Sequence, residues 1–285
     1  MESESSRAQT VFICSLRWLE FTFICSNFKT CYKAIMSKLL LLCLLLLSQA
    51  LDWSSSQSDC PYRCQCFSPV QVLCADERMS NLPLNMSQHV REFILMTSSV
   101  SYLFTHTLKA SPQLTKLIFL NNAIRSIHAH AFEHLLQLQE LEISGNPWLE
   151  SLYMGTFSKQ HNLTKLMLNY NRLKTVQLGM FASLRQVETL QMKSNIISYL
   201  PPLLFANMTR LRVLDLSLNK LEEVTRETFS GLGQLEVLKL NNNLLQNLSS
   251  DVLSDVAELR ELHLEGNKIS QLSEAIFCNY PTWSY

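Results

Sequence analysis

Residues 211–219 read LRVLDLSLN, and the pattern L-x-x-L-x-L-x-x-N that they contain recurs along most of the chain, with other apolar residues sometimes replacing leucine. The closing asparagine of this copy is Asn219. Successive closing asparagines are 24 residues apart in five of six intervals and 25 apart in the sixth. This fixed period indicates an array of similar structural units. The other copies span residues 114–122, 138–146, 163–171, 187–195, 235–243 and 259–267.

Each copy predicts a short strand followed by a turn. Leu214 and Leu216 are two residues apart, so both side chains point to one face of an extended strand. The amide of Asn219 can bond to backbone groups of the turn and of the neighbouring unit. One unit cannot enclose a core, so the units must stack. A second apolar column follows the asparagines by ten or eleven residues: Phe132, Phe157, Phe181, Phe205, Phe229, Leu253 and Phe277.

These features resemble the leucine-rich repeat family. The resemblance implies an α/β fold, a horseshoe-shaped solenoid with a parallel β-sheet on its concave side and short helices or turns on its convex side. Residues 90–98 fit the frame as a degenerate first unit with Ser98 in the asparagine position, so we expect about eight repeats within 90–285. No cysteine-rich closing cap follows the last copy. We therefore expect a truncated array, in which Cys278 has no evident partner.

The first fifty residues predict secretion. Residues 36–50 combine Lys38, a leucine run and the small residues Ser48 and Ala50, which is typical of a signal peptide cleaved after Ala50. The apolar run is too short to span a bilayer. Residues 1–35 fit no repeat and are either a gene-model extension upstream of Met36 or a long leading region removed with the signal. Residues 51–59 are serine-rich and predict a linker. Because of the signal peptide, the mature protein is expected to be secreted and extracellular.

Four closely spaced cysteines follow the linker: Cys60, Cys64, Cys66 and Cys74. Such a group can ligate zinc or form two disulfides, and an oxidising extracellular compartment favours disulfides. The spacing C-x3-C-x-C-x7-C resembles the amino-terminal cap of leucine-rich repeat proteins. That resemblance implies the pairs Cys60–Cys66 and Cys64–Cys74. The cap, residues 60–89, is expected to cover the apolar edge of the first repeat.

The sequence predicts no enzyme and no cofactor. Lysine plus arginine and aspartate plus glutamate number 24 each, so the zero net charge gives no basis for nucleic-acid binding. No nucleophile motif, phosphate-binding loop or cysteine–histidine pair is evident. His128, His130 and His134 are close enough in sequence to suggest a metal site. They fall on the segment expected to be convex and solvated, so we interpret them as surface residues.

Four N-x-S/T sequons predict N-linked glycans on the secreted chain. None of them lies on a predicted strand, so glycans there would leave the concave sheet open. The asparagines concerned are Asn85, Asn162, Asn207 and Asn247.

The residues between the inward leucines form the outer surface of the predicted sheet. A solvated sheet face should carry polar side chains, but an apolar group stands at its amino-terminal end, and an exposed apolar patch with a polar border marks an interaction site. Packing under the cap, or against a second copy, would also account for it. The residues that we assign to partner binding are Ile94, Met96, Ile118 and Leu120, with Met167 and Tyr170 farther along.

Residues 60–176 carry a narrower resemblance. The segments CP at 60–61, CQC at 64–66, LTKLIFLN at 114–121, LEI at 141–143 and LMLNYN at 166–171 resemble the non-catalytic subunits of the carboxypeptidase N type. The resemblance implies a secreted regulatory subunit that binds and stabilises the catalytic subunit of a zinc carboxypeptidase. The alternative function is the ectodomain of an adhesion or innate-immune receptor of the same repeat family.

Overall fold

The computed structural model describes residues 60–277 and residue 280. The expectations about residues 1–35, the signal peptide, the linker and Cys278 concern segments outside the described residues. Among the residues that are described, no helix has the length and apolar content needed to cross a membrane.

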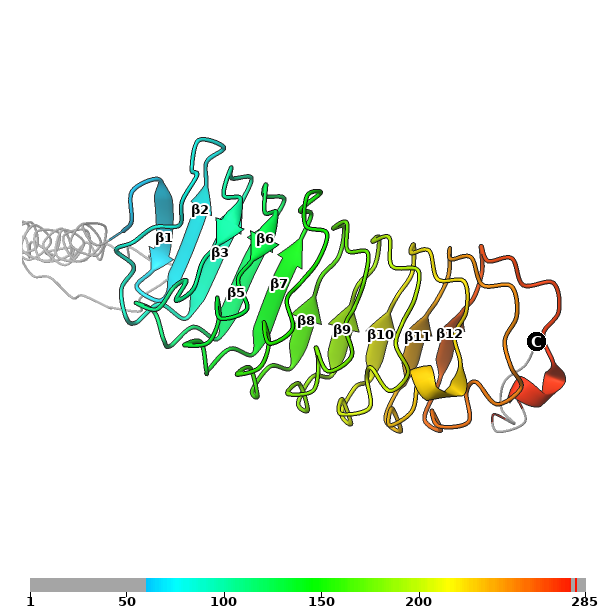
Figure 1. Ribbon diagram of the computed structural model, residues 1–285. Coiled ribbons are helices and arrows are strands. Elements are labelled where there is room, and N and C mark those ends of the chain that lie inside the picture. The colour runs from blue at the N-terminus through cyan, green and yellow to red at the C-terminus, as the bar shows by residue number, and fades with distance from the viewer. Residues whose placement is uncertain (1–59, 278–279, 281–285) are drawn as a thin grey trace, which may run out of the picture. The chain divides into compact units, whose positions relative to one another are not determined.

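One sheet runs through the repeats, with its strands side by side in chain order (Figure 1). Its first two strands are antiparallel and every later pair is parallel, with one strand from each successive coil. The strands are β1 (Cys64–Ser68), β2 (Gln71–Ala75), β3 (Glu92–Met96), β5 (Lys116–Leu120), β7 (Glu140–Ser144), β8 (Lys165–Met167), β9 (Thr189–Gln191), β10 (Val213–Asp215), β11 (Val237–Lys239) and β12 (Glu261–His263).

The segments that return the chain to the sheet contain little regular structure. The short strands β4 (Tyr102–Leu103) and β6 (Ser126–Ile127) pair in parallel with each other. Two 3-10 helices, η1 (Arg226–Thr228) and η2 (Glu274–Phe277), lie in the later coils. The other return segments in the described range are turns, in agreement with the expected solenoid of strands and turns.

The sheet aligns equivalent residues of successive coils. Leu214 of β10 is level with Leu190 of β9 and Leu238 of β11, and all three side chains are completely buried. This register follows from the constant repeat length, because 24 residues return each strand to the same level. The leucines therefore form a continuous core column, as the sequence predicts.

The phenylalanine column is the second half of the core. Phe132, Phe157, Phe181, Phe205 and Phe229 are fully buried. The ring centroids of Phe157 and Phe181 are 6.3 Å apart, and those of Phe181 and Phe205 are 6.0 Å apart with nearly parallel planes. The ring of Phe181 thus packs between its counterparts in the two neighbouring coils.

The buried asparagines tie the coils together. Nδ2 of Asn219 donates to the carbonyl oxygen of Leu216 at 3.0 Å and to that of Met192, in the preceding coil, at 2.9 Å. Its Oδ1 accepts from the backbone N–H of Ile197 at 3.1 Å. One side chain therefore satisfies backbone groups of its own turn and of the adjacent coil, which confirms the role expected from the sequence.

The amino-terminal cap extends the sheet. Disulfides join Cys60 to Cys66 and Cys64 to Cys74, which are the pairs that the cap resemblance implies. Strand β2 of the cap hairpin pairs along its length with β3 of the first repeat. The cap thereby closes the hydrogen-bonding edge of the parallel sheet, which would otherwise be open to pairing with another chain.

At the carboxyl end of the described residues, Tyr280 returns to the core. Its side chain is buried, and its hydroxyl lies 2.7 Å from the carbonyl oxygen of Val256 and 3.1 Å from that of Leu253. The inward side chains of the last repeat, Leu262 and Leu264, are only partly buried.

Candidate functional site

The outer face of the sheet presents three columns of side chains, because alternate strand residues point away from the core. The middle column is Leu73, Ile94, Ile118, Glu142, Met167, Gln191, Asp215, Lys239 and His263, which strand pairing places level with one another. From Ile94 onward, this is the column that the repeat spacing predicts.

An apolar block stands at the amino-terminal end of this face; we define it as Leu73, Ile94, Met96, Ile118 and Leu120. Ile94 is level with Leu73 on one side and Ile118 on the other, and Met96 is level with Leu120. All five side chains are half-buried rather than buried. The block therefore forms one continuous apolar surface across β2, β3 and β5.

Leu73 is the member that sequence reasoning missed. It belongs to the cap and not to a repeat, so the repeat pattern could not assign it to a column. The pairing of β2 with β3 places it beside Ile94. The cap hairpin lies in the same sheet as the block, so it widens the block and does not cover it.

Polar groups border the apolar block. Glu142 and Ser144 of β7 follow Ile118 and Leu120 at the same levels. In the column next to Ile118, Nζ of Lys116 lies 3.1 Å from the carboxylate of Glu140. Nζ of Lys165 lies 3.2 Å from the same carboxylate. Partial burial raises the pKa of Glu140, but the hydrogen bonds and charges of the two lysines outweigh it and hold that pKa below its usual value. The carboxylate is therefore ionised at neutral pH.

The two remaining residues assigned to partner binding lie apart from the block. Met167 is in the middle column, but Glu142 separates it from Ile118 and only 8% of its surface is accessible. Tyr170 is 56% exposed, and Nζ of Lys193 lies 5.8 Å from its ring centroid. Met167 offers little area to a partner, whereas Tyr170 offers a separate exposed ring.

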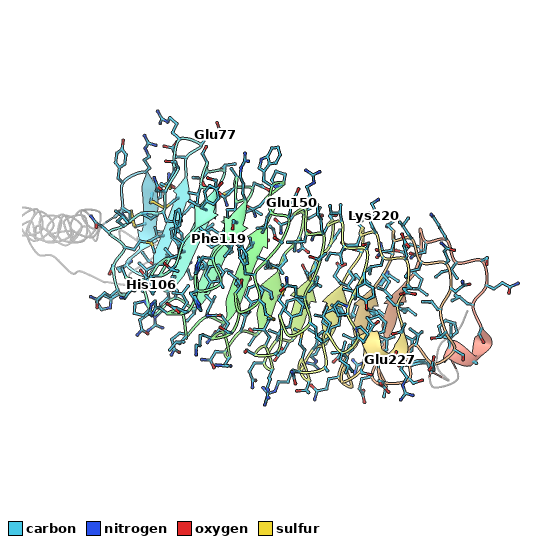
Figure 2. All side chains as sticks on the ribbon, in the orientation of Figure 1. Glu77, His106, Phe119, Glu150, Lys220 and Glu227 are labelled. Atoms are coloured by element: carbon cyan, nitrogen blue, oxygen red, sulfur yellow. A yellow bond between two sulfur atoms is a disulfide. The ribbon has the colours of Figure 1, made fainter. Side chains whose placement is uncertain are left out.

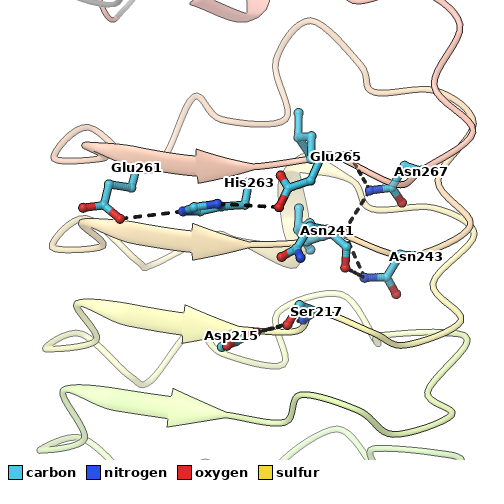
Figure 3. Close-up of polar contacts among 10 residues, drawn as sticks. Asp215, Ser217, Asn241, Asn243, Glu261, His263, Glu265 and Asn267 are labelled. Carbon is cyan, nitrogen blue, oxygen red and sulfur yellow. Dashed lines mark hydrogen bonds and ion pairs between the residues drawn. The ribbon is translucent and has the colours of Figure 1, made fainter.

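The carboxyl-terminal part of the face is polar (Figure 3). Oδ1 of Asp215 accepts hydrogen bonds from the hydroxyl and the backbone N–H of Ser217, at 2.6 and 3.0 Å. His263 lies between two carboxylates, 3.7 Å from Glu261 and 3.8 Å from Glu265. The two ends of the sheet therefore differ in chemistry, and only the amino-terminal end combines apolar area with a charged border.

The four sequon asparagines are exposed and lie outside the strands. Nδ2 of Asn162, the atom that would carry a glycan, donates to the carbonyl oxygen of Leu136 at 2.9 Å. A glycan at this position would replace one of the two hydrogens on Nδ2 and leave the other available for that bond. Asn85, Asn162, Asn207 and Asn247 all remain predicted acceptor sites.

A cluster of histidines lies on the return segments, away from the outer face. His106, from one coil, meets Glu133 and His134 of the next coil, and His130 contacts the same glutamate. Sequence reasoning noticed His128, His130 and His134 but missed His106 and Glu133. The available signal was the 24-residue interval between His106 and His130, which gives them equivalent positions in adjacent coils.

Several characterised proteins share part of this sequence. Human reticulon-4 receptor-like 2 is 33% identical over 127 residues, which are 44% of this chain and 29% of that protein. Trophoblast glycoprotein of Macaca fascicularis is 28% identical over 92 residues, or 31% of this chain and 22% of that protein. The chain thus spans less than a third of the length of these relatives.

Solved structures show the same architecture. The crystal structure of human 5T4, the trophoblast glycoprotein, superposes with a TM-score of 0.60 and 26% identity over 73% of this chain and 81% of that one. The structure of the Toll–Spatzle complex from Drosophila superposes with a TM-score of 0.67 and 25% identity over 73% of this chain and 28% of that one.

The family model for the leucine rich repeat matches residues 88–148, 148–197, 161–221, 187–235 and 209–269. These matches cover more than half of the chain and coincide with the coils described above. The chain belongs to the leucine-rich repeat family.

Proposed function

We propose that this chain is an extracellular protein-binding scaffold whose apolar block receives a protein partner. The observation that carries the proposal is that Leu73, Ile94 and Ile118 lie side by side on three adjacent strands. The Lys116–Glu140 ion pair borders this apolar surface. Apolar centres with polar rims are characteristic of protein interfaces. Charges at the rim favour one orientation of the partner and exclude partners of the wrong charge.

The energetics are adequate for specific binding. Burying one aliphatic side chain of this size contributes about 1.5–3 kcal/mol when it was fully exposed before. The members of the block are half-buried already, so each contributes less than that full value. Two or three of them buried together still exceed the roughly 1.4 kcal/mol that changes an affinity tenfold.

The relatives favour the ectodomain of a receptor or adhesion protein as the context of this scaffold. The relatives reported above are named as a receptor-like protein and a glycoprotein, and the Toll structure is a complex with another protein, Spatzle. A regulatory subunit of a secreted carboxypeptidase is the second candidate. It rests on the sequence segments of residues 60–176 alone, because none of the relatives reported above is named as a carboxypeptidase subunit.

Substituting Ile118 tests the binding surface. Ile118→Glu should leave folding nearly intact, because the side chain points away from the core, yet weaken partner binding at least tenfold (about 1.4 kcal/mol). The matched control is Lys239→Glu, which occupies the same column at the polar end of the sheet and should change affinity less. Both variants are titrated by surface plasmon resonance against a carboxypeptidase catalytic subunit and against partners obtained from a secreted-protein display library.

The outcomes separate the two candidates. Binding to the carboxypeptidase subunit that Ile118→Glu weakens would support the regulatory role, and binding only to another secreted protein would support the ectodomain role. A partner that binds wild type and Ile118→Glu with equal affinity would show that the apolar block is not the contact surface.

A further inference from the structure

The histidine cluster joins two neighbouring coils. His106 follows β4, whereas Glu133 and His134 follow β6 in the next coil, and β4 and β6 are hydrogen-bonded to each other. Figure 2 shows His106 at the edge of the array opposite Glu77, Glu150 and Lys220. The hydroxyl of Thr107 donates to the carbonyl oxygen of Phe104 at 2.6 Å, which holds the turn that carries His106.

Three ligand atoms converge at this place. Nδ1 of His106 lies 2.8 Å from Nε2 of His134 and 2.8 Å from Oε1 of Glu133. Nε2 of His134 lies 3.4 Å from the same Oε1. All three atoms are within 4.8 Å of one another and each can donate a lone pair.

Hydrogens cannot give each of these three contacts a separate, linear hydrogen bond. The two ring nitrogens can carry at most one hydrogen each, and an ionised carboxylate carries none. Three close contacts therefore share at most two hydrogens, so they cannot all be separate, linear hydrogen bonds. If both nitrogens are protonated, two N–H groups face each other across 2.8 Å. One cation in the centre would accept a lone pair from all three atoms at once.

We propose that His106, Glu133 and His134 bind a divalent transition metal ion, with Zn²⁺ as the fitting species. Zinc accepts imidazole nitrogen and carboxylate oxygen at about 2.0–2.2 Å, so tetrahedral ligand atoms lie about 3.3 Å apart. The observed separations of 2.8–3.4 Å reach this value with small side-chain movements. Two imidazoles in the ligand set favour zinc, copper or nickel over calcium and magnesium.

His130 supports the ligand set through the glutamate. Its Nδ1 lies 3.4 Å from Oε2 of Glu133, the carboxylate oxygen that does not face the other two ligands. Its ring lies against that of His128, with centroids 5.6 Å apart. Outer partners of this kind orient the ligating carboxylate, so His130 is a positioning residue.

The ion would reach the site from solvent and would crosslink two coils. The side chains of His106, Glu133 and His134 are 53%, 26% and 36% exposed. Three protein ligands leave the fourth position to water or to a donor from another molecule. Because the ligands come from adjacent coils, zinc bound to the folded array but not to the unfolded chain stabilises the coils next to the cap.

Zinc binding to the secreted, tag-free chain tests the proposal directly. We expect one Zn²⁺ per chain by isothermal titration calorimetry, a rise in Tm on adding zinc, and no such rise with Ca²⁺ or Mg²⁺. His106→Ala, Glu133→Gln and His134→Ala should each weaken zinc binding at least tenfold. His130→Ala should weaken it less, because His130 acts through Glu133.

The controls are His161→Ala and His263→Ala, which remove histidines outside the cluster and should leave zinc affinity unchanged. Circular dichroism checks that each variant is folded. Glu133→Gln keeps the size of the side chain, so its zinc affinity still tests the proposal if an alanine variant fails to fold. Absence of zinc binding at about 100 μM to wild type, or equal zinc affinity in wild type and Glu133→Gln, would overturn the proposal. This test does not depend on the apolar block, whose variants are expected to bind zinc normally.

Discussion

At the scale of single residues, the asparagine that closes each repeat determines how the coils are joined. Asn219 is buried and uses both ends of its amide, donating to carbonyl oxygens of two coils and accepting from the N–H of Ile197. Aspartate lacks the N–H groups and leucine lacks both donor and acceptor. Asn146 shows the limit of the pattern, because its Oδ1 has no hydrogen-bond partner among the described residues. It opens the single 25-residue interval, and its Nδ2 donates to the carbonyl oxygen of Ser144 and to Oδ1 of Asn171.

Replacing Asn219 by leucine should therefore destabilise the array. The change keeps a similar volume but leaves buried backbone groups of two coils unpaired, which costs about 1–3 kcal/mol for each unsatisfied group. The matched control is Asn267→Leu, since Asn267 makes equivalent bonds at a half-exposed position where water can replace them. Urea unfolding, monitored by circular dichroism, measures the free energy of unfolding of both variants. Equal losses of unfolding free energy at the two sites would contradict this explanation.

At the scale of the strands, charged side chains link neighbours across the sheet. Glu140 of β7 pairs with Lys116 of β5 and with Lys165 of β8. Its pKa is lowered from the usual 4.5, because the two lysines outweigh the opposing effect of partial burial. The ionised form of Glu140 is thus more stable, relative to its protonated form, in the folded state than in the unfolded state.

This shift predicts a pH-dependent contribution to stability. A carboxyl group whose pKa is lowered on folding stabilises the protein above its unfolded pKa of about 4.5, and this contribution is lost as the pH falls through the folded value. Glu140→Gln should reduce the free energy of unfolding at pH 7 by up to about 1 kcal/mol, because the pair is partly exposed. The difference from wild type should shrink as the pH falls below about 4.5 and disappear below the lowered pKa of the folded state. Chemical unfolding at several pH values tests this, with the exposed Glu188→Gln as control; a difference independent of pH would refute it.

The strands also show what the sequence can and cannot predict. The columns follow from repeat length, so Ile94 and Ile118 could be placed side by side without a structure. The burial of Met167 could not be predicted from the sequence, because it depends on how neighbouring side chains pack over a strand. Leu73 was missed because cap and repeats follow different patterns. The meeting of His106 with Glu133 was missed because the 26 intervening residues include β5 and β6, and the repeat pattern sets the strand positions but not the path of the return segments that carry the two side chains.

At the scale of the whole repeat array, stability depends on contacts between neighbouring coils. Each coil packs mainly on the coils before and after it, so the total is close to a sum of unit and neighbour contributions. In the middle of the array, the leucine column, the asparagines and the phenylalanine column all cross the boundaries between coils. A change in the middle of the array therefore weakens two boundaries at once.

The phenylalanine column allows this dependence to be measured. Phe205→Ala removes a fully buried ring that packs against Phe181, and should lower the free energy of unfolding by about 3–5 kcal/mol through lost burial and the resulting cavity. Phe205→Leu should cost clearly less, because the array already accommodates buried Leu253 in the same column. Thermal and urea unfolding compare the two variants. If the two variants lost similar amounts of unfolding free energy, filling most of the cavity with leucine would have had no effect. The column would then require an aromatic ring at this position and not only apolar volume.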